Sequence, residues 1–272
     1  MSNLLRVELF KVIRSKVFRI LLATITFISF SVVFLFFLNE KGILEKIDGM
    51  DISVEAHPQA SEFVLVSGIG FLIEQIHAPD AFLTIIIISV LGSFLIATEN
   101  STGVIKNTVS IGYRRIEIYL AKKIVYSLSA ILLILVFSVT LGIFGSIFFG
   151  IGDWPATELL IQTGKIILLT CLYVIAFASV VMLFAMMANS SGFAFIASLG
   201  FYLIFGPALN LLAHQYVFFE KLNHYSIYHR FSLLAGSDLA GNDLLGLGML
   251  PVIWTIIFVV IGTIMFKKKD IQ

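Results

Sequence analysis

The sequence is poor in charged residues. Asp, Glu, Lys and Arg make up 13% of its 272 residues, whereas they make up about a quarter of a typical soluble domain. Hydrophobic residues make up 59%, and the mean hydropathy is +1.02. The apolar residues form continuous runs and do not alternate with polar ones, which excludes a transmembrane β-barrel. The composition therefore predicts an all-α membrane protein, because an uncharged run of about 20 helical residues can cross the hydrocarbon core.

Several catalytic signatures are also missing. The phosphate-loop motif GxxxxGK[ST] does not occur, so the chain cannot bind ATP by that route. HExxH does not occur either, and no apolar run has an acidic residue at its centre, which argues against an intramembrane protease or an ion-coupled carrier. The only cysteine, Cys171, lies inside an apolar run, so no intrachain disulfide is possible. We expect no catalytic residue, cofactor, metal or nucleic-acid partner.

The apolar runs divide into six predicted membrane spans. The stretch 166–219 has no charged residue over 54 positions, which is too long for one crossing at about 1.5 Å per residue. Its polar break "ANSSG" at 188–192 is typical of a turn and divides it in two. All spans belong to one transmembrane domain over 1–272. The predicted spans are residues 20–38, 81–98, 124–150, 159–187, 193–213 and 246–266.

Lys and Arg are distributed unevenly along the chain. With six spans, both termini lie on one side of the membrane together with the loop 99–123. That side carries 13 of the 18 basic residues, and the other side carries 13 of the 17 acidic residues. The positive-inside rule therefore places both termini in the cytoplasm, and the loops 39–80 and 214–245 outside. Abundant Ile, Phe and Lys suit an AT-rich bacterial genome, so we expect a multi-pass protein of a bacterial cell membrane.

Residues 1–19 precede the first span and have an amphipathic pattern. One helix face is predicted to hold Leu5, Leu9, Val12 and Ile13. The opposite face is predicted to hold mostly Glu8, Lys11, Arg14 and Ser15. This pattern predicts a helix that lies at the cytoplasmic membrane surface, where its basic residues meet anionic headgroups. An ordinary positively flanked start of the first span fits the same periodicity.

The two long outer loops are predicted to contain short helices. The second half of 39–80 is apolar enough to form a helix on the outer leaflet or to extend the second span outward. Pro207 should kink or end the fifth span, and the segment 214–245 is expected to hold short helices that return toward the membrane. A metal site in that segment is a weaker alternative. Its candidate ligands are His214, Glu220, His224 and His229.

The third span carries a small residue at every fourth position. These residues are Ser138, Gly142, Ser146 and Gly150. Such a ladder on one helix face allows another helix to approach closely. The pattern predicts either packing within the subunit or a contact between two subunits.

The loop 99–123 contains a second short amphipathic helix. Apolar and small residues recur at helical spacing in Val104, Ile105, Thr108, Val109 and Ile111. Ser101 or Thr102 is a candidate N-cap, and Gly112 is a candidate C-cap. The pattern predicts a short helix between two membrane spans, with an apolar stripe that needs a partner surface. A solvated basic loop that only satisfies the positive-inside rule is the alternative.

The motifs of this loop resemble those of the ABC-2 type permease subunits of ATP-binding cassette exporters. In order along the chain they are Glu99, "STG" at 101–103, Lys106, Gly112, Arg114 or Arg115, and Lys122. The opening "VELFKVIRSK" at 7–16 is similar to the start of the same family, where an acidic residue precedes a Lys. The sequence differs from the family pattern in having Gly112 where relatives often have Pro, and in the order of Gly and Thr.

The resemblance implies that the loop is a coupling helix that docks on a separate ATPase. It implies that Val104, Ile105, Thr108 and Val109 bury against that ATPase. It also implies that Lys106, Arg114 and Arg115 pair with acidic residues or lipid phosphates. The implied coupling residues are Glu99, Gly103, Val104, Ile105, Lys106, Thr108, Val109, Gly112, Arg114, Arg115 and Lys122. The implied partners are two copies of a cytoplasmic ATPase and a second permease subunit, either identical or paralogous.

The implied function is ATP-driven export or removal of a substrate, with the ATPase activity in a partner subunit. The predicted spans are rich in Phe, Ile and Leu with scattered Ser and Thr, which favours an amphipathic or hydrophobic substrate such as an antimicrobial peptide or a drug. Two alternatives stay open. One is an ATP-independent membrane sensor or immunity protein, and the other is an exporter of sodium or another small substrate.

Overall fold

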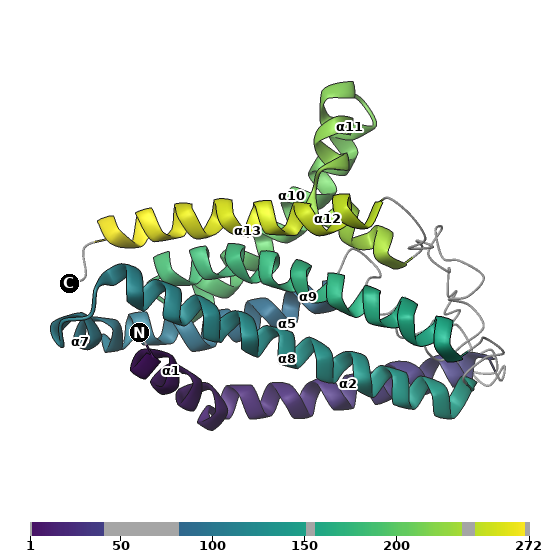
Figure 1. Ribbon diagram of the computed structural model, residues 1–272, viewed down its shortest axis with the longest axis horizontal. Coiled ribbons are helices and arrows are strands. Elements are labelled where there is room, and N and C mark those ends of the chain that lie inside the picture. The colour runs from purple at the N-terminus through teal and green to yellow at the C-terminus, as the bar shows by residue number, and fades with distance from the viewer. Residues whose placement is uncertain (1, 41–81, 151–155, 236–242, 270–272) are drawn as a thin grey trace.

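The computed structural model describes residues 2–40, 82–150, 156–235 and 243–269, and within these ranges every regular element is helical (Figure 1). The predicted outer helix in the second half of 39–80 lies outside the described residues. The first half of the chain forms α1 (Ser2–Arg14), α2 (Lys16–Glu40), α5 (Phe82–Gly92), η2 (Ser93–Ala97), α6 (Thr98–Ser101), α7 (Val104–Ser110) and α8 (Arg115–Phe149). The second half forms α9 (Ala156–Met187), α10 (Ser191–Ala213), α11 (Val217–His224), α12 (Ile227–Ser232), η3 (Leu233–Ala235) and α13 (Asp243–Lys268).

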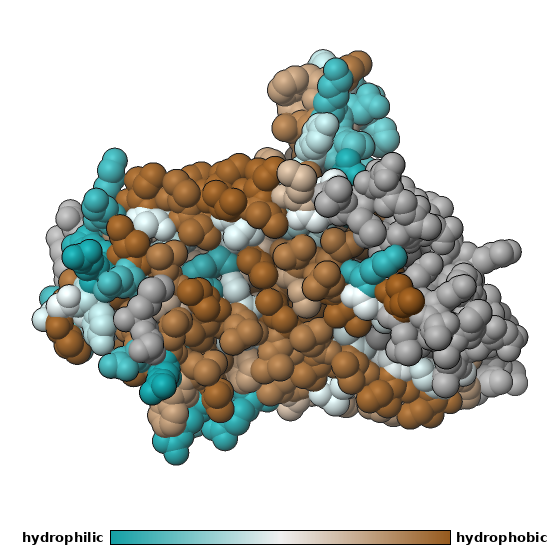
Figure 2. Space-filling model, viewed as in Figure 1, coloured by the Kyte–Doolittle hydropathy of each residue, from teal (hydrophilic) through white to brown (hydrophobic). Residues whose placement is uncertain are grey.

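Six helices in the described ranges are long and apolar enough to cross a membrane. They are α2, the continuous helix from α5 through η2 to α6, then α8, α9, α10 and α13. The all-α fold class with six membrane-length helices is therefore confirmed. Hydrophobic side chains cover the middle of the face seen in Figure 2, while hydrophilic ones gather at the end that carries α7 and on α11.

The long helices run side by side along the longest axis of the molecule (Figure 1). Helix α2 packs along α8, and α13 packs along α9, which also contacts α5 and α10. The α2–α8 contact is partly polar, since Thr140 Oγ1 donates to Ser29 Oγ at 2.8 Å. Helix α1, α7 and the carboxyl end of α13 lie at the same end of the bundle (Figure 1), as six crossings require.

Helix α1 is a separate helix and not the start of the first span. The helical pattern breaks at Ser15, whose Oγ accepts a hydrogen bond from the backbone N–H of Phe18 at 3.0 Å. This bond satisfies one of the free N–H groups at the start of α2. The hydroxyl therefore fixes the point where the chain turns from α1 into the first long helix.

The face of α1 that turns toward the bundle carries a carboxylate as well as apolar side chains. Leu4, Glu8 and Val12 are buried, whereas Phe10 and Ile13 are each 59% exposed. The sequence pattern grouped Ile13 with Val12 and placed Glu8 mostly opposite, whereas the structure buries Glu8 together with Val12 and leaves Ile13 exposed. The reason is that Glu8 has partners inside the protein, which are described below.

Helix α12 folds back onto the bundle after α10 and α11. Helix α12 buries Tyr228 and Phe231, whose rings lie 6.0 Å and 5.4 Å from the ring of Phe177 in α9. The ring of Tyr202 in α10 lies 5.6 Å from Tyr228. Short helices are thus present in 214–235, and α12 packs against α9, α10 and α13 while α11 stands away from the bundle (Figure 1).

Helix α10 continues through Pro207 to Ala213, so the proline does not end the fifth long helix. An isolated proline is tolerated in an apolar helix when neighbouring groups compensate for the lost backbone hydrogen bond. Of the two outcomes predicted for Pro207, termination does not occur.

The predicted ladder of small residues on α8 does not form the α2 contact. Ser138 is buried, and its Oγ donates to the carbonyl of Ile134 at 2.8 Å. Gly142 and Ser146 are half-buried, and Gly150 is exposed just after the helix. The α2 contact uses Phe144 and Phe148, which lie on the other side of α8 at about 100° per residue. A subunit contact through the ladder stays a prediction.

Helices α8 and α13 approach closely at Gly262. A Cβ atom added there would lie 2.1 Å from Tyr119 Oη, and Tyr119 is fully buried. We therefore expect Gly262→Ala to lower the thermal unfolding midpoint of the protein in detergent by several degrees, because overpacking costs about 1–3 kcal/mol.

Gly248→Ala is the matched control in the same helix. Its added Cβ would lie 3.8 Å from Leu169 Cδ2, an ordinary contact distance. The unfolding midpoint of this variant should equal that of the wild type. Equal midpoints for the two variants would show that the α8–α13 contact is looser than described.

Candidate functional site

The short helix α6, which leads into α7, follows a π-helical turn in the second long helix. The turn η2 covers Ser93–Ala97 and comes just before Glu99 in α6. A π turn adds one residue per turn relative to an α-helix, so it rotates every later side chain by about 100° around the helix axis. The turn therefore decides which neighbours Glu99 and Asn100 can reach.

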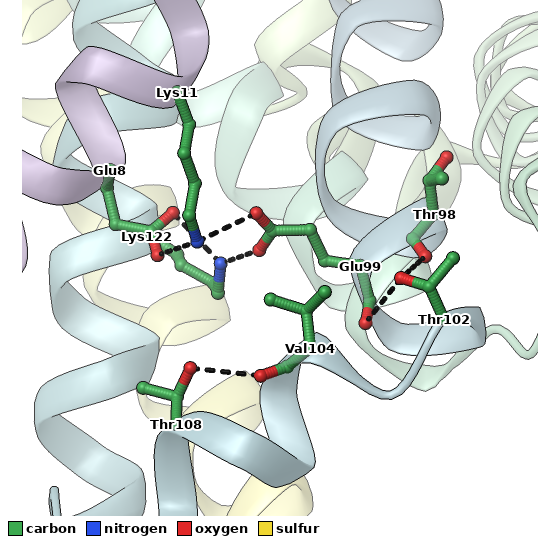
Figure 3. A network of polar contacts seen from close by, with 8 residues as sticks. All are labelled: Glu8, Lys11, Thr98, Glu99, Thr102, Val104, Thr108 and Lys122. Atoms are coloured by element: carbon green, nitrogen blue, oxygen red, sulfur yellow. Dashed lines mark hydrogen bonds and ion pairs between the residues drawn. The ribbon is translucent and has the colours of Figure 1, made fainter. Parts of the chain in front are cut away.

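Glu99 belongs to a closed ring of four alternating charges (Figure 3). Lys11 Nζ lies 3.0 Å from Glu8 Oε1 and 3.0 Å from Glu99 Oε1. Lys122 Nζ lies 2.9 Å from Glu8 Oε2 and is also bonded to Glu99 Oε2. Each carboxylate thus gives one oxygen to each lysine. The ring joins α1, α6 and α8, which are far apart in the sequence.

The ring lies largely inside the protein. Lys122 is 4% exposed and Glu8 is 7% exposed, so water contributes little to their solvation. Two positive and two negative charges balance, as buried charges require. Burial by itself would lower the pKa of Lys11, but the carboxylates of Glu99 and Glu8 outweigh it and raise this pKa above its usual 10.5.

The raised pKa has a defined consequence for stability. A lysine whose pKa is higher in the folded than in the unfolded protein stabilises the folded state. This contribution is complete at pH values below the pKa of the unfolded state, and it is lost as the pH rises through the pKa of the folded state. The contribution of Lys11 is therefore fully present at neutral pH. It would be lost only at strongly alkaline pH.

Helix α7 is anchored on one side and exposed on the other. Gly103 precedes it with φ +74°, and Gly112 follows it with φ +102°, which is the left-handed region that glycine adopts without strain. Ile105 is 1% exposed and belongs to the hydrophobic core of the chain itself. Ile111 is 76% exposed just after the helix. The predicted helix is present, but its buried side chain already has a place inside this chain.

The other residues expected to face a partner are less buried. Val104, Thr108 and Val109 are half-buried, and Lys106, Asn107 and Ser110 are exposed. Neither predicted N-cap is used, because the hydroxyls of Ser101 and Thr102 donate back to the carbonyl of Thr98. The N-cap position is occupied by Gly103.

The two arginines after α7 have different roles. Arg114 is exposed, and its backbone N–H donates to Glu117 Oε2 at 3.4 Å, at the start of α8. Arg115 Nη1 donates to the carbonyls of Lys267 and Lys269, at 3.0 Å and 2.6 Å. Arg115 thus binds backbone oxygens of the C-terminal segment, and its pairing with an acidic residue or a lipid phosphate stays a prediction.

Of the predicted coupling residues, the structure brings Glu99 and Lys122 into one cluster. The ring partners Glu8 and Lys11 were not predicted as site residues, although Glu8 is the only acidic residue before Glu40. That isolation is a usable signal, because a lone acid in a basic helix is a candidate for an ion pair within the protein. Asn100 was also missed, since a single asparagine gives no pattern.

The alternative of a metal site finds no support in the described ranges. No group of three or more His, Cys, Asp or Glu side chains there is arranged to hold a metal ion. The ring nitrogens of His224 lie 3.1 Å and 3.3 Å from Arg230 Nη2, so this histidine already contacts a cation.

Comparison with known protein families gives a match that covers more than half of the chain. The model of the family described as "ABC-2 family transporter protein" matches residues 4–207. The matched range includes the charged ring, α7 and the first five long helices as far as Pro207. No curated protein matches the sequence.

The charged ring can be tested with a double-mutant cycle of Glu99→Gln and Lys122→Gln. Lys122→Gln leaves the carboxylates of Glu8 and Glu99 with one lysine between them, and breaking a buried pair costs about 3–5 kcal/mol. The double variant should be less destabilised than the sum of the single variants, by about 0.5–3 kcal/mol. The unfolding midpoint in detergent is the measurement.

Lys106→Gln is the control for this cycle. It removes one exposed lysine of α7, so it should leave the midpoint unchanged. Additive effects of Glu99→Gln and Lys122→Gln would mean that the two side chains do not form the pair.

Proposed function

The chain belongs to the ABC-2 transporter family, and from this premise we propose that it is the permease subunit of an ATP-binding cassette exporter. It is a multi-pass protein of the cell membrane. Its family works with an ATPase subunit, and the chain has no phosphate-loop motif of its own. We propose two ATPase copies and a second permease subunit, identical or paralogous, because six helices are few for a translocation path.

The observation that carries the proposal is the position of α7. This helix lies at the end of the bundle that also holds α1 and the carboxyl end of α13 (Figure 1), and it joins the second and third long helices. The positive-inside rule supports a cytoplasmic location for this end. A cytoplasmic ATPase would therefore meet α7 first.

We propose separate roles for the residues in α7 and just after it. Ile105 is buried in the core of this chain, so we assign it the role of anchoring α7. Exposed Ile111 would provide the main apolar contact, and Lys106 would provide a positive charge. Val104, Thr108 and Val109 are half-buried and could contribute only their outer atoms.

The charged ring supports a way to transmit movement from α7. Glu99 lies in α6, just before α7, and is bonded to Lys122 in α8 and to Lys11 in α1. A displacement of α7 by the ATPase would move these helices with it, because separating the charges inside the protein is costly. Rigid-body shifts of packed helices are a common form of such switching.

The proposed substrate is amphipathic or hydrophobic, such as an antimicrobial peptide or a drug. The exposed side chains of the described long helices are mostly Phe, Ile, Leu and Val. Charged side chains at the centres of these helices, which a path for a bare cation would favour, are absent from the described spans. Export is the proposed direction of transport.

Association with the ATPase is the test. A tagged chain purified from its native membranes should carry a soluble ATPase with it. Ile111→Asp should weaken this association about tenfold or more, since a tenfold change corresponds to about 1.4 kcal/mol. The measurement is the dissociation constant of the purified ATPase for the permease in detergent.

Phe218→Asp is the matched control. Phe218 lies in α11, away from α7, and its exposure of 71% is close to the 76% of Ile111. This variant should bind the ATPase as the wild type does. Equal weakening by both substitutions, or purification without any ATPase, would contradict the proposed function.

A further inference from the structure

The carboxyl end of α9 is held by side chains from two distant parts of the chain. The last carbonyls of a helix have no partner within the helix. Asn100 Nδ2 donates to the carbonyls of Met186, at 3.3 Å, and of Ala188. Lys269 Nζ donates to Met186 O at 2.9 Å and to Met187 O at 3.4 Å. The carbonyl of Met186 therefore accepts from both.

Lys269 is itself fixed in position by α8. The guanidinium of Arg115 donates to the carbonyl of Lys269 at 2.6 Å and to that of Lys267 at 3.0 Å. The side-chain amine of Lys269 points to backbone oxygens, and burial lowers its pKa below the usual value. Hydrogen bonds thus run without interruption from α8, through the C-terminal segment, to the end of α9.

Asn100 is the neighbour of Glu99, and the two side chains reach different helices. Glu99 bonds to lysines of α1 and α8, whereas Asn100 bonds to the end of α9. Both lie in α6, the single helical turn that leads into α7. A movement of α7 would therefore act on α1 and α8 through Glu99, and on α9 through Asn100.

Helix α9 is well placed to spread such a movement. Among the six membrane-length helices it has the largest buried share, since 67% of its most apolar 18-residue stretch is buried. It also contacts α5, α8, α10 and α13. Its end leads directly into α10, where Ser190 Oγ accepts from the N–H of Phe193 at 3.2 Å. A shift of the Met186 carbonyl would act on both helices.

We propose that Asn100 and Lys269 are positioning residues. Through their bonds to the carbonyls at the end of α9, they form a second contact by which a movement of α7 reaches α9 and α10. We call the bonds of Asn100 and Lys269 to the carbonyls of residues 186–188 the carbonyl clamp. The charged ring carries the movement of α7 to α1 and α8, and the carbonyl clamp carries it to α9 and α10. The proposal rests on the proposed function, since it assumes that an ATPase moves α7. It also assigns the C-terminal segment 267–269 a part in transport.

The test compares two reporters of nucleotide-driven movement in the intact complex of permease and ATPase. A spin label is placed in a Cys171→Ser background at Asn189→Cys, in the turn after α9, or at Asn3→Cys, on α1; both sites are exposed. The spectra are recorded without nucleotide and after trapping with Mg-ATP and vanadate. In the wild type we expect both labels to respond.

Asn100→Ala and Lys269→Ala should each reduce the response of the label at Asn189, and the double variant should lose most of it. The response at Asn3 should persist, because the charged ring is intact. Lys269→Arg keeps the donor groups and should restore the response at Asn189. Ser101→Ala, next to Asn100 and bonded only to the carbonyl of Thr98 in its own turn, should leave both responses unchanged.

The outcomes separate the two proposals. A full response at Asn189 in the double variant would overturn the clamp, and so would an equal loss at both labels, which would indicate a merely structural role. Unfolding midpoints of the variants check that the helices are intact. A wild-type complex with no nucleotide response at either label would contradict the proposed function instead.

Discussion

Four paired charges, of which Glu8 and Lys122 are buried, set the arrangement at one end of this protein. Glu8, Lys11, Glu99 and Lys122 each need partners of opposite sign, because an unpaired charge inside a protein is costly. The closed ring in Figure 3 meets this need for all four at once. It can form only if α1 lies against α8 and the second long helix ends beside both.

The ring explains why α1 turns as it does. With Glu8 facing the bundle, the opposite side of α1 presents Val7, Phe10 and Ile13, which are 51%, 59% and 59% exposed. Apolar side chains interleaved with basic ones suit the interface between headgroups and acyl chains. The apparent amphipathicity of residues 1–19 is therefore divided between an inner face with ion pairs and an outer apolar face. A helix that only floated on the membrane would not need to bury a carboxylate.

The α7 end of the bundle and the region around α12 are held by different interactions. Around α7, ion pairs and hydrogen bonds to free helix carbonyls connect the helices, and these bonds are directional and can exchange partners. Around α12, aromatic rings in edge-to-face contact, such as Phe177, Tyr202 and Phe231, connect them, and such packing resists sliding because protein interiors are close-packed. This difference fits the proposed function, in which an ATPase moves the α7 end while the packing around α12 holds the helices together.

The sequence by itself determined the membrane class, the six long helices, the short helix α7 and the family resemblance. These depend on uncharged run length, local periodicity and a motif of about 25 residues, which are all local properties. The same reasoning could not orient α1, since the positions of Leu9 and Ile13 fit either face until the partners of Glu8 are known.

Only the tertiary structure decided how the site is built. The bond between Lys122 and Glu8 joins residues 114 positions apart, and the one between Lys269 and Met186 joins residues 83 apart. The π turn at Ser93–Ala97 sets the rotation of Glu99 and Asn100, and no propensity in the sequence marks it. Contacts of this kind depend on which helices pack together and at what rotation, and packing is a property of the whole bundle rather than of any one segment.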